Sequence, residues 1–371
     1  MSLQNRLRSQ LRITWHLPAI LGVLVVLAGG ALTWNWAAAP APRVIRLHGS
    51  HREIGLQHGR LLRHEIRALY DAYVVHGIVE KEGHSLESLL ATAHHYDARI
   101  PKALREEMHG IADGARVPYD EILVMNTFAD ALLGRNRFCS AVAVHGKDGL
   151  LVGRNLDWVN HGVAHRSGVV FVLEPTGERS VLSVGWPGIA GVVTGMNDRG
   201  VTVSLNMAFG GKDGDGTPAL LRIRDALSRA TTAQDVVATA TREPRTMAMN
   251  WMVTSGDEDR ALVLEMTGDE YAVRPMDRGC AVTTNHFEAL PIHGGAGSDR
   301  TSLLRSRFAD HPSATVSEIE RALLRVAFLG PPEGLLTVQS VVFEPKSRVA
   351  HVAIGRIPAP SGRFYEVRLL Q

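Results

Sequence analysis

Cys139 begins an apolar stretch, CSAVAVH (139–145), and an Arg-Asn-x-Asp sequence containing Arg154 and Asp157 follows it. A thiol attacks a carbonyl carbon only as its thiolate, so a reactive cysteine needs a nearby base or cation. No His and Asn pairing of the papain type accompanies this cysteine. If the peptide bond before Cys139 is broken, however, its own α-amino group lies beside the sulfur. That amine, with a pKa of about 8, suits proton transfer at neutral pH.

A site of this kind also needs an anion for the ammonium, donors for the oxyanion and a cation for the thiolate. The sequence resembles the acyltransferase and autoproteolytic hydrolase family of isopenicillin-N acyltransferase, which belongs to the N-terminal-nucleophile (Ntn) hydrolases. More distantly, it resembles the choloylglycine hydrolases, that is, bile salt hydrolase and penicillin V acylase. The blocks that carry the resemblance are LHGSHREIGLQHGRLL (47–62), EEMHGIADGARVPYDEILVMN (106–126), CSA (139–141), GRNLDW (153–158), GWPGIAGVVTGMNDRGVTVSLN (185–206), TTNHF (283–287) and TSLLR (301–305).

The resemblance implies roles for the residues around the cysteine. Cys139 corresponds to the nucleophile, and self-cleavage of the Phe138–Cys139 bond would free its amine to act as the base. Arg154 corresponds to the arginine beside the thiolate, and Asp157 to the aspartate that accepts hydrogen bonds from the new amine. Many relatives have glycine where this chain has Phe138, so we expect the bulkier residue to make self-cleavage less efficient.

Three positions farther along the chain complete the implied site. Asn206 matches an oxyanion donor of the bile salt hydrolase branch, and Asn285 matches the asparagine that helps to hold the same region. Arg305 matches a supporting arginine, and Arg300 is a competing candidate for that role. The resemblance implies no cofactor.

Each of these residues also has an ordinary structural interpretation. A buried cysteine at the start of a strand usually acts as a small hydrophobic residue. Arg154 and Asp157 could form a structural ion pair, the asparagines could satisfy local turns, and Arg305 could lie on a solvated helix face. A disulfide between Cys139 and Cys280 is a further alternative, because these are the two cysteines of a chain that we expect to be exported.

The composition excludes several classes of function. The 371 residues are 45% hydrophobic and 21% charged, with a net charge of +2 and no basic run, so nucleic acid is not an expected partner. The sequence has neither an HExxH motif nor a Cys/His cluster, so we expect no metal site. GGKDGDGTP (210–218) faintly resembles a calcium loop but lacks the closing glutamate, and a mobile loop near the substrate mouth is the preferred interpretation.

The first forty residues differ from the rest. Three arginines precede an uncharged, largely apolar run (17–36) that is about long enough to span a bilayer. Positive charge before such a run predicts a cytoplasmic N-terminus and a catalytic part in the periplasm or outside the cell. We prefer an uncleaved transmembrane anchor. The alternative is a signal peptide cut near AAAPAP (37–42), which would release the protein.

The remaining sequence changes character at Cys139. Residues 44–138 are mostly helical in pattern, with apolar residues at three- and four-residue intervals and helix starts at Ser85 and Pro101. Beyond them, short strand patterns alternate with helix pairs over 218–243 and 298–328. Together with the resemblance, this predicts an α+β fold, a four-layer αββα sandwich of two stacked antiparallel sheets flanked by helices. The expected divisions are 1–43 (anchor and linker), 44–138 (helical pro-segment) and 139–371 (catalytic body).

The expected function is that of an autoproteolytically activated amidohydrolase or acyltransferase. It would act on a small acyl-amide substrate through an acyl-enzyme on Cys139, and the pro-segment would remain bound as a subunit. One alternative is a membrane-proximal lipid amidase of ceramidase or phospholipase-B-like type. The other is an uncleaved, anchored binding protein without catalytic activity.

Overall fold

The structure, a computed structural model, describes residues 41–132, 138–292 and 299–370. The chain from Ala41 onward forms one unit in which the helical segment is not separated from the strand-rich body. The expected membrane-spanning run (17–36) lies outside the described residues. Within the described ranges, no helix is both long enough and apolar enough to cross a bilayer.

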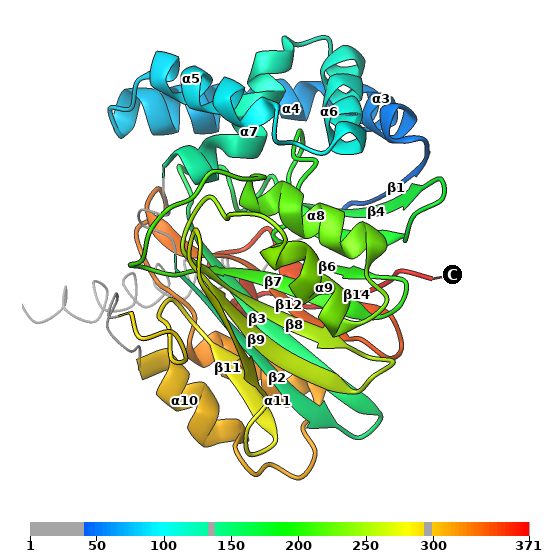
Figure 1. Cartoon of the computed structure of the whole chain (residues 1–371), viewed down its shortest axis with the longest axis vertical. Coiled ribbons are helices and arrows are strands. Elements are labelled where there is room, and N and C mark those ends of the chain that lie inside the picture. Colours follow the sequence, from blue (N-terminus) through cyan, green and yellow to red (C-terminus); the bar gives the residue numbers. More distant parts are fainter. Residues whose placement is uncertain (1–40, 133–137, 293–298, 371) are drawn as a thin grey trace, which may run out of the picture. The chain divides into compact units, whose positions relative to one another are not determined.

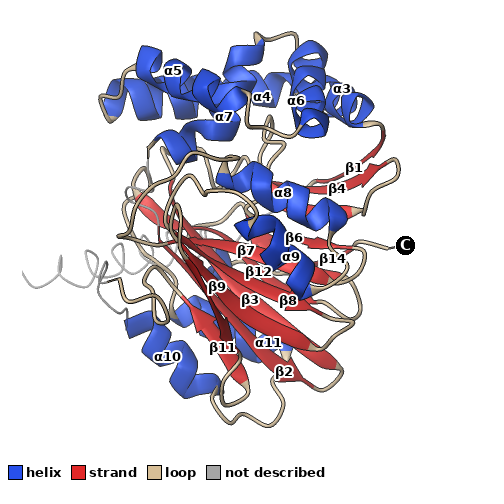
Figure 2. Cartoon of the chain, viewed as in Figure 1, coloured by secondary structure: helices blue, strands red, loops and turns tan. Residues whose placement is uncertain are grey.

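Strands in the described ranges form two sheets (Figures 1 and 2). The eight-stranded sheet has the order β1 (Val44–Gly49), β4 (Val169–Pro175), β5 (Val181–Gly185), β6 (Thr194–Asn197), β7 (Val201–Met207), β8 (Met249–Ser255), β9 (Arg260–Met266) and β10 (Tyr271–Pro275). The six-stranded sheet has the order β11 (Cys280–Thr283), β2 (Phe138–Gly146), β3 (Gly149–Val159), β12 (Leu335–Glu344), β13 (Val349–Ile354) and β14 (Tyr365–Arg368).

The two sheets stack face to face, with helices on both outer faces. Alternate residues of the strands, such as Ala141, Val263 and Phe343, form an apolar core between the sheets. The eight-stranded sheet is covered by α8 (Ala219–Arg229) and α9 (Ala233–Thr241), and the six-stranded sheet by α10 (Asp299–Phe308) and α11 (Val316–Arg325). This is the order of layers that the sequence predicted.

The segment before Cys139 forms the helices at the top of Figure 1. Ser85 caps the helix at Leu86–Asp97 by accepting the Ser88 N–H, as its position in the sequence predicted. Part of the first expected helical stretch is instead a twelve-residue π-helix, a rare element that is often found at functional sites. The elements are α3 (His51–Leu61), α4 (Arg63–Leu69), the π-helix η1 (Tyr70–Lys81), α5 (Leu86–Asp97), α6 (Lys102–Ala115) and α7 (Tyr119–Ala131).

Four glycines bring α3 and α6 into backbone contact. Gly55 and Gly59 on α3 lie against Gly110 and Gly114 on α6. A Cβ atom at Gly55 would come within 2.0 Å of the Glu107 carbonyl oxygen, and one at Gly59 within 2.2 Å of the Ile111 carbonyl oxygen. Any larger residue would push the helices apart, and this explains the paired glycines in the first two sequence blocks.

The helical segment also contributes a strand to the larger sheet. Residues 44–49, which the pattern assigned to a mostly helical region, form β1 and pair in parallel with Val170–Pro175 on β4. We had expected an antiparallel sheet, but the β1–β4 pair is parallel, so this sheet is mixed. Leu47 is fully buried in this position, so the strand is held by packing as well as by hydrogen bonds.

A buried ionic cluster also connects the helical segment to the body. His51 Nδ1 lies 2.7 Å from Glu107 Oε2, and His51 Nε2 lies 3.2 Å from Glu178 Oε2. Arg224 on α8 donates to Glu107 Oε2 at 3.2 Å. Burial alone would lower the pKa of His51, but its hydrogen bonds to the two glutamates outweigh this and raise the pKa to about 9. The imidazolium is therefore the stable form at neutral pH.

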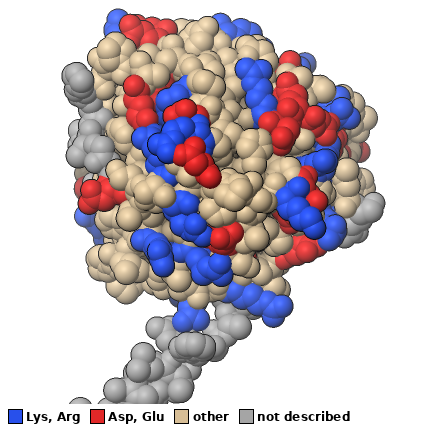
Figure 3. Space-filling model, turned by 90° about the horizontal axis from the view of Figure 1, so that it is seen from below, with Lys and Arg blue, Asp and Glu red and all other residues tan. Residues whose placement is uncertain are grey.

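The charged surface is mixed. On the face seen in Figure 3, lysine and arginine side chains are interspersed with acidic ones. Ion pairs also join different elements of the molecule, for example Arg307 of α10 and Glu318 of α11 at 2.6 Å. Such a face has no extended field of one sign.

Candidate active site

The β2–β3 ladder places Cys139 and Arg154 on the same face of the six-stranded sheet. Cys139 pairs with Leu156, and Ala141 pairs with Arg154. Directly paired residues of an antiparallel ladder project to the same side, and alternate residues share a face. The side chains of Cys139 and Arg154 are therefore diagonal neighbours that point between the sheets, toward β6 and β7.

Arg154 brings a buried positive charge to this face. Its side chain is 1% exposed. Nε donates to Thr194 Oγ1 at 3.1 Å, and Nη1 donates to Asn206 Oδ1 at 2.9 Å. Both acceptors are neutral, and Nη2 has no hydrogen-bond partner within the described part of the chain. A buried guanidinium with a free donor can stabilise an anion close to it, and the Cys139 sulfur is a neighbouring group that can become one.

Asp157 provides the negative charge of the site, on the opposite side of β3. One carboxylate oxygen accepts from Arg300 Nη1 at 2.6 Å, and the other accepts from Thr337 Oγ1 at 2.5 Å. Asp157 is fully buried. Burial raises its pKa to about 6, although Arg300, Thr337 and Arg154 all act to lower it. The carboxylate is thus ionised at neutral pH and becomes protonated in mild acid.

Asn285 connects the cysteine to this ion pair. Its Oδ1 accepts the Cys139 backbone N–H at 2.9 Å and Arg300 Nη2 at 3.0 Å. Its Nδ2 donates to the Met207 carbonyl oxygen at 2.6 Å, which fixes the orientation of the amide. The backbone nitrogen of Cys139 is therefore held by a side chain that lies far away in the sequence.

The thiol itself is enclosed in the intact chain. Cys139 is 1% exposed. Burial raises its pKa, while Arg154 and a hydrogen bond from the Asp157 backbone N–H act in the opposite direction. The thiol is therefore closed off from solvent in the described, uncleaved chain.

Phe138, on the N-terminal side of the same peptide bond, is held by aromatic contacts. Its ring stacks on Phe328 with the centroids 5.9 Å apart and the planes inclined by 1°, and it contacts Phe209 at 5.9 Å. The Arg300 guanidinium carbon lies 5.9 Å from the ring centroid of Phe138. The bulky residue at this position is thus held by two rings and a guanidinium.

The structure favours Arg300 over Arg305 as the supporting arginine. Arg305 projects from α10 toward the surface, where its Nη2 pairs with the carboxylate of Glu288 at 2.8 and 2.9 Å. Its side chain remains 45% exposed. Our assignment of Arg305 to the site does not agree with this position, whereas the competing candidate Arg300 contacts both Asp157 and Asn285.

Asn206 lies in the site, but its amide is already engaged. Nδ2 donates to the Thr283 carbonyl oxygen at 3.0 Å, while Oδ1 accepts from Arg154. An amide nitrogen carries two hydrogens, so one remains for an oxyanion. The role of Asn206 as an oxyanion donor stays a prediction.

The Cys139–Cys280 disulfide is absent. Both cysteines are free. Cys280 pairs with Val144 across β11 and β2, five positions along the strand from Cys139. That separation is too large for a disulfide bond.

The sequence did not identify two hydroxyl groups of the site, those of Thr194 and Thr337. Thr194 lies within one of the family-like blocks but carries no signal of its own. Thr337 lies in β12 and likewise carries no signal of its own. Each orients a charged group of the site, Thr194 through Arg154 and Thr337 through Asp157.

The segment once compared with a calcium loop is engaged in ion pairs. Asp215 contacts Arg99 and His95 of the helical segment. Across the residues that the structure describes, no three His, Cys, Asp or Glu side chains are grouped as metal ligands would be.

Comparison with known proteins relates most of this site to one family. Residues 144–322 match the family model described as acyl-coenzyme A:6-aminopenicillanic acid acyl-transferase. The match contains Arg154, Asp157, Asn285 and Arg300, and it begins after Cys139.

Relatives in three organisms extend over more of the chain. The acyl-coenzyme A:6-aminopenicillanic-acid-acyltransferase 40 kDa form of Emericella nidulans is 27% identical over 266 residues, which are 70% of this chain and 72% of the relative. An uncharacterised protein of Archaeoglobus fulgidus is 28% identical over 274 residues, 63% of this chain and 45% of that protein. Protein dcd1B of Dictyostelium discoideum is 24% identical over 258 residues, 61% of this chain and 50% of the relative. The chain thus spans about half the length of the latter two.

Solved structures give weaker likenesses. The N-acylethanolamine-hydrolyzing acid amidase ortholog of Caenorhabditis elegans superimposes with a TM-score of 0.45 at 19% identity, over 56% of this chain and 93% of that one. Penicillin V acylase of Agrobacterium tumefaciens gives a TM-score of 0.43 at 11% identity, over 58% of this chain and 83% of that one.

Proposed function

We propose that this chain, a homologue of the acyl-coenzyme A:6-aminopenicillanic acid acyltransferases, is a self-activating enzyme that uses Cys139 to cleave or transfer an acyl group at an amide bond. The arrangement at one peptide bond carries the proposal. The sulfur of Cys139 shares a strand face with the partly unpaired Arg154, its nitrogen is held by Asn285, and the preceding residue is held by Phe328.

Self-cleavage would proceed as an attack on the adjacent carbonyl. The Cys139 sulfur adds to the carbonyl carbon of Phe138 as the thiol proton leaves, which gives a tetrahedral oxyanion. Collapse of this intermediate breaks the C–N bond, protonates the nitrogen and leaves Phe138 as a thioester on the sulfur. Water then hydrolyses the thioester, which yields a carboxylate at Phe138 and a free amine at Cys139.

The mature site would repeat this chemistry on an external amide. The Cys139 amine accepts the thiol proton, the thiolate attacks the substrate carbonyl, and the protonated amine delivers its proton to the leaving nitrogen. Nη2 of Arg154 stabilises the thiolate, and the second hydrogen of the Asn206 amide is placed to stabilise an oxyanion. Water or an acceptor amine then releases the acyl group.

The proposal assigns no cofactor and keeps the helical segment as a bound subunit after cleavage. The buried His51–Glu107–Arg224 contacts and the pairing of β1 with β4 support that retention.

The arginines before the apolar run at 17–36 support a membrane anchor, with the catalytic part outside the cytoplasm. Digestion of the catalytic part by protease added to intact spheroplasts would test this location.

Intact-mass measurement with N-terminal sequencing tests the central step. Wild type should yield two fragments, one of which begins at Cys139, and Cys139→Ala should remain a single chain. Cys280→Ala is the matched control, because it also removes a buried thiol, and it should cleave like wild type. A wild-type chain that stays whole in folded protein would instead support an uncleaved binding protein.

A further inference from the structure

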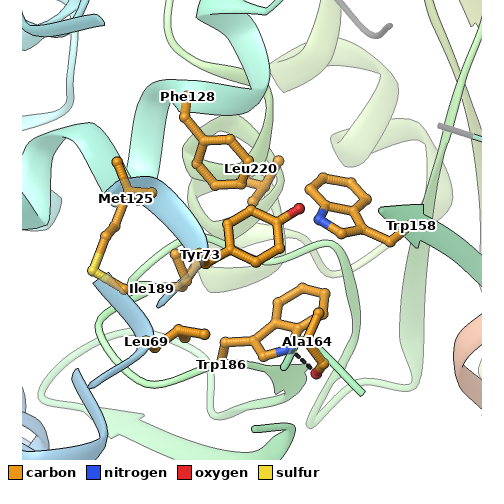
Figure 4. Close-up of a pocket in the computed structure, with 10 residues that line it drawn as sticks. Leu69, Tyr73, Met125, Phe128, Trp158, Ala164, Trp186, Ile189 and Leu220 are labelled. Atoms are coloured by element: carbon orange, nitrogen blue, oxygen red, sulfur yellow. Dashed lines mark hydrogen bonds between the residues drawn. The ribbon is translucent and has the colours of Figure 1, made fainter. Parts of the chain in front are cut away.

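An apolar pocket lies between the helical segment and the strand-rich body (Figure 4). Aromatic rings dominate its walls: Trp158 and Trp186 come from the body, and Tyr73 and Phe128 from the helical segment. The ring centroids of Trp158 and Trp186 are 6.0 Å apart, and those of Tyr73 and Phe128 are 5.6 Å apart. Aliphatic side chains, among them Leu69 and Leu220, close the remaining sides.

This pocket lies on the same strand face as the proposed nucleophile. Trp158 follows Leu156 by two residues on β3, so both side chains project to one side. Leu156 is the ladder partner of Cys139. The indole of Trp158 is thus one row beyond the thiol, on the same face of the sheet.

The walls offer little to a polar ligand. Tyr73 Oη donates to the Val159 carbonyl oxygen at 2.9 Å. Trp186 Nε1 donates to the Ala164 carbonyl oxygen at 2.7 Å, the bond dashed in Figure 4. Neither contact is easily given up, because a buried donor without a partner is costly. A charged or hydroxylated ligand would lose its hydration here with little compensation.

The pocket is also narrow. The cavity has a volume of about 40 Å³ between its aromatic and aliphatic walls. It suits a flat ring or an unbranched chain, and a bulky polycyclic group would have to displace the walls.

We propose that this pocket binds the acyl part of the substrate, and that the acyl group is apolar and either flat or unbranched. The inference rests on the proposed function, because it places the acyl carbonyl at Cys139. It also assigns a specificity role to the helical segment, since Tyr73 on the π-helix and Phe128 on α7 form one wall.

A binding measurement tests the pocket without turnover. Full-length Cys139→Ala would be titrated with octanamide, phenylacetamide and succinamic acid, and tryptophan fluorescence would be followed. Octanamide and phenylacetamide should give saturable changes, and succinamic acid should give none. Equal binding of succinamic acid, or no binding of any of the three, would overturn the assignment.

Pocket-filling variants locate the binding. Ala164→Leu places extra atoms among the lining residues and should weaken octanamide binding about tenfold or more. Ala68→Leu is the matched control on the exposed side of α4, and it should bind like the parent. If Ala164→Leu fails to fold, Ile189→Phe fills the same pocket from a partly exposed position. Unchanged binding in a folded filling variant would refute the site.

Turnover by processed wild type separates this inference from the proposed function. The substrates would be p-nitroanilides with octanoyl, phenylacetyl, adamantane-carbonyl and succinyl groups. The first two should be cleaved about tenfold or more faster in kcat/KM than the others. Preference for the succinyl or adamantane compound would overturn the inference and leave the proposed function standing. If no compound were cleaved while octanamide still bound, the proposed function would fail and the pocket would stand as an apolar binding site.

Discussion

The Cys139 backbone N–H donates a 2.9 Å hydrogen bond to Asn285 Oδ1. This nitrogen belongs to the peptide bond whose cleavage we propose, so its partner is in place before the bond breaks. Arg300 donates to the same oxygen at 3.0 Å. Asn285 thereby connects the Cys139 nitrogen to the buried ion pair of Arg300 and Asp157.

The first prediction contrasts Arg300 and Arg305 of α10. Arg300→Ala leaves the buried Asp157 carboxylate without its cation, and we expect self-cleavage to slow about 100-fold. Arg305→Ala removes an exposed ion pair and should change the free energy of unfolding by less than about 1 kcal/mol. Gels of cleavage against time, with thermal melts of both variants, make the comparison. Similar cleavage rates in the two folded variants would contradict the assignment of Arg300 to the site.

The second prediction concerns acid pH. The pKa of Asp157 is raised to about 6, chiefly by burial. If the ionised carboxylate is required, self-cleavage should fall as the pH drops through about 6 and recover on return to pH 7. Thr337→Val removes one hydrogen bond that favours the ionised carboxylate, so the fall in self-cleavage rate should begin at a higher pH. A fall at the same pH in wild type and Thr337→Val would count against Asp157 as its origin.

The third prediction concerns Phe138. Phe328→Ala removes the ring on which Phe138 stacks, so the scissile carbonyl should be held less firmly. We expect self-cleavage to slow about tenfold, while the chemistry of Cys139 itself is untouched. Phe328→Leu fills much of the same space and should recover part of the rate. Faster cleavage in Phe328→Ala would mean that the aromatic contact restrains the bond rather than aligning it.

The fourth prediction concerns alkaline pH and the helical segment. Because the pKa of His51 rises from 6.5 to about 9 in the folded protein, its contribution is complete below pH 6.5 and is lost as the pH rises through 9. That contribution amounts to about 3 kcal/mol. The melting temperature should therefore fall between pH 7 and about 9.5, and His51→Ala should show a smaller fall over that range. An equal fall in wild type and variant would place the titrating group elsewhere.

Much of this architecture could be predicted from local signals, because strands and helix starts depend on neighbouring residues. Ser85 caps α5 as expected, and the helix pairs expected over 218–243 and 298–328 are present as α8 with α9 and α10 with α11. β1 could not be identified in this way. Its place in a sheet depends on β4, more than a hundred residues away, and short apolar runs fit either helix or strand.

The choice between Arg300 and Arg305 shows a second limit of the sequence. The two residues are five positions apart on one helix, which separates their side chains by about 140° around its axis. The pattern of α10 does not reveal which side faces β11 and β2, because both sides contain arginine. Only the tertiary contacts of Asp157 and Glu288 distinguish them.

The position of β1 has a consequence for what self-cleavage would produce. Once the bond before Cys139 is cut, β1 and β4 belong to different polypeptides, yet they remain hydrogen-bonded neighbours in one sheet. Separation of the two pieces would leave the main-chain donors and acceptors along one side of β4 without partners. An exposed strand edge of this kind promotes aggregation. The processed molecule would therefore behave as a nicked monomer rather than as a dissociable heterodimer, and neither piece should be obtainable alone in native form.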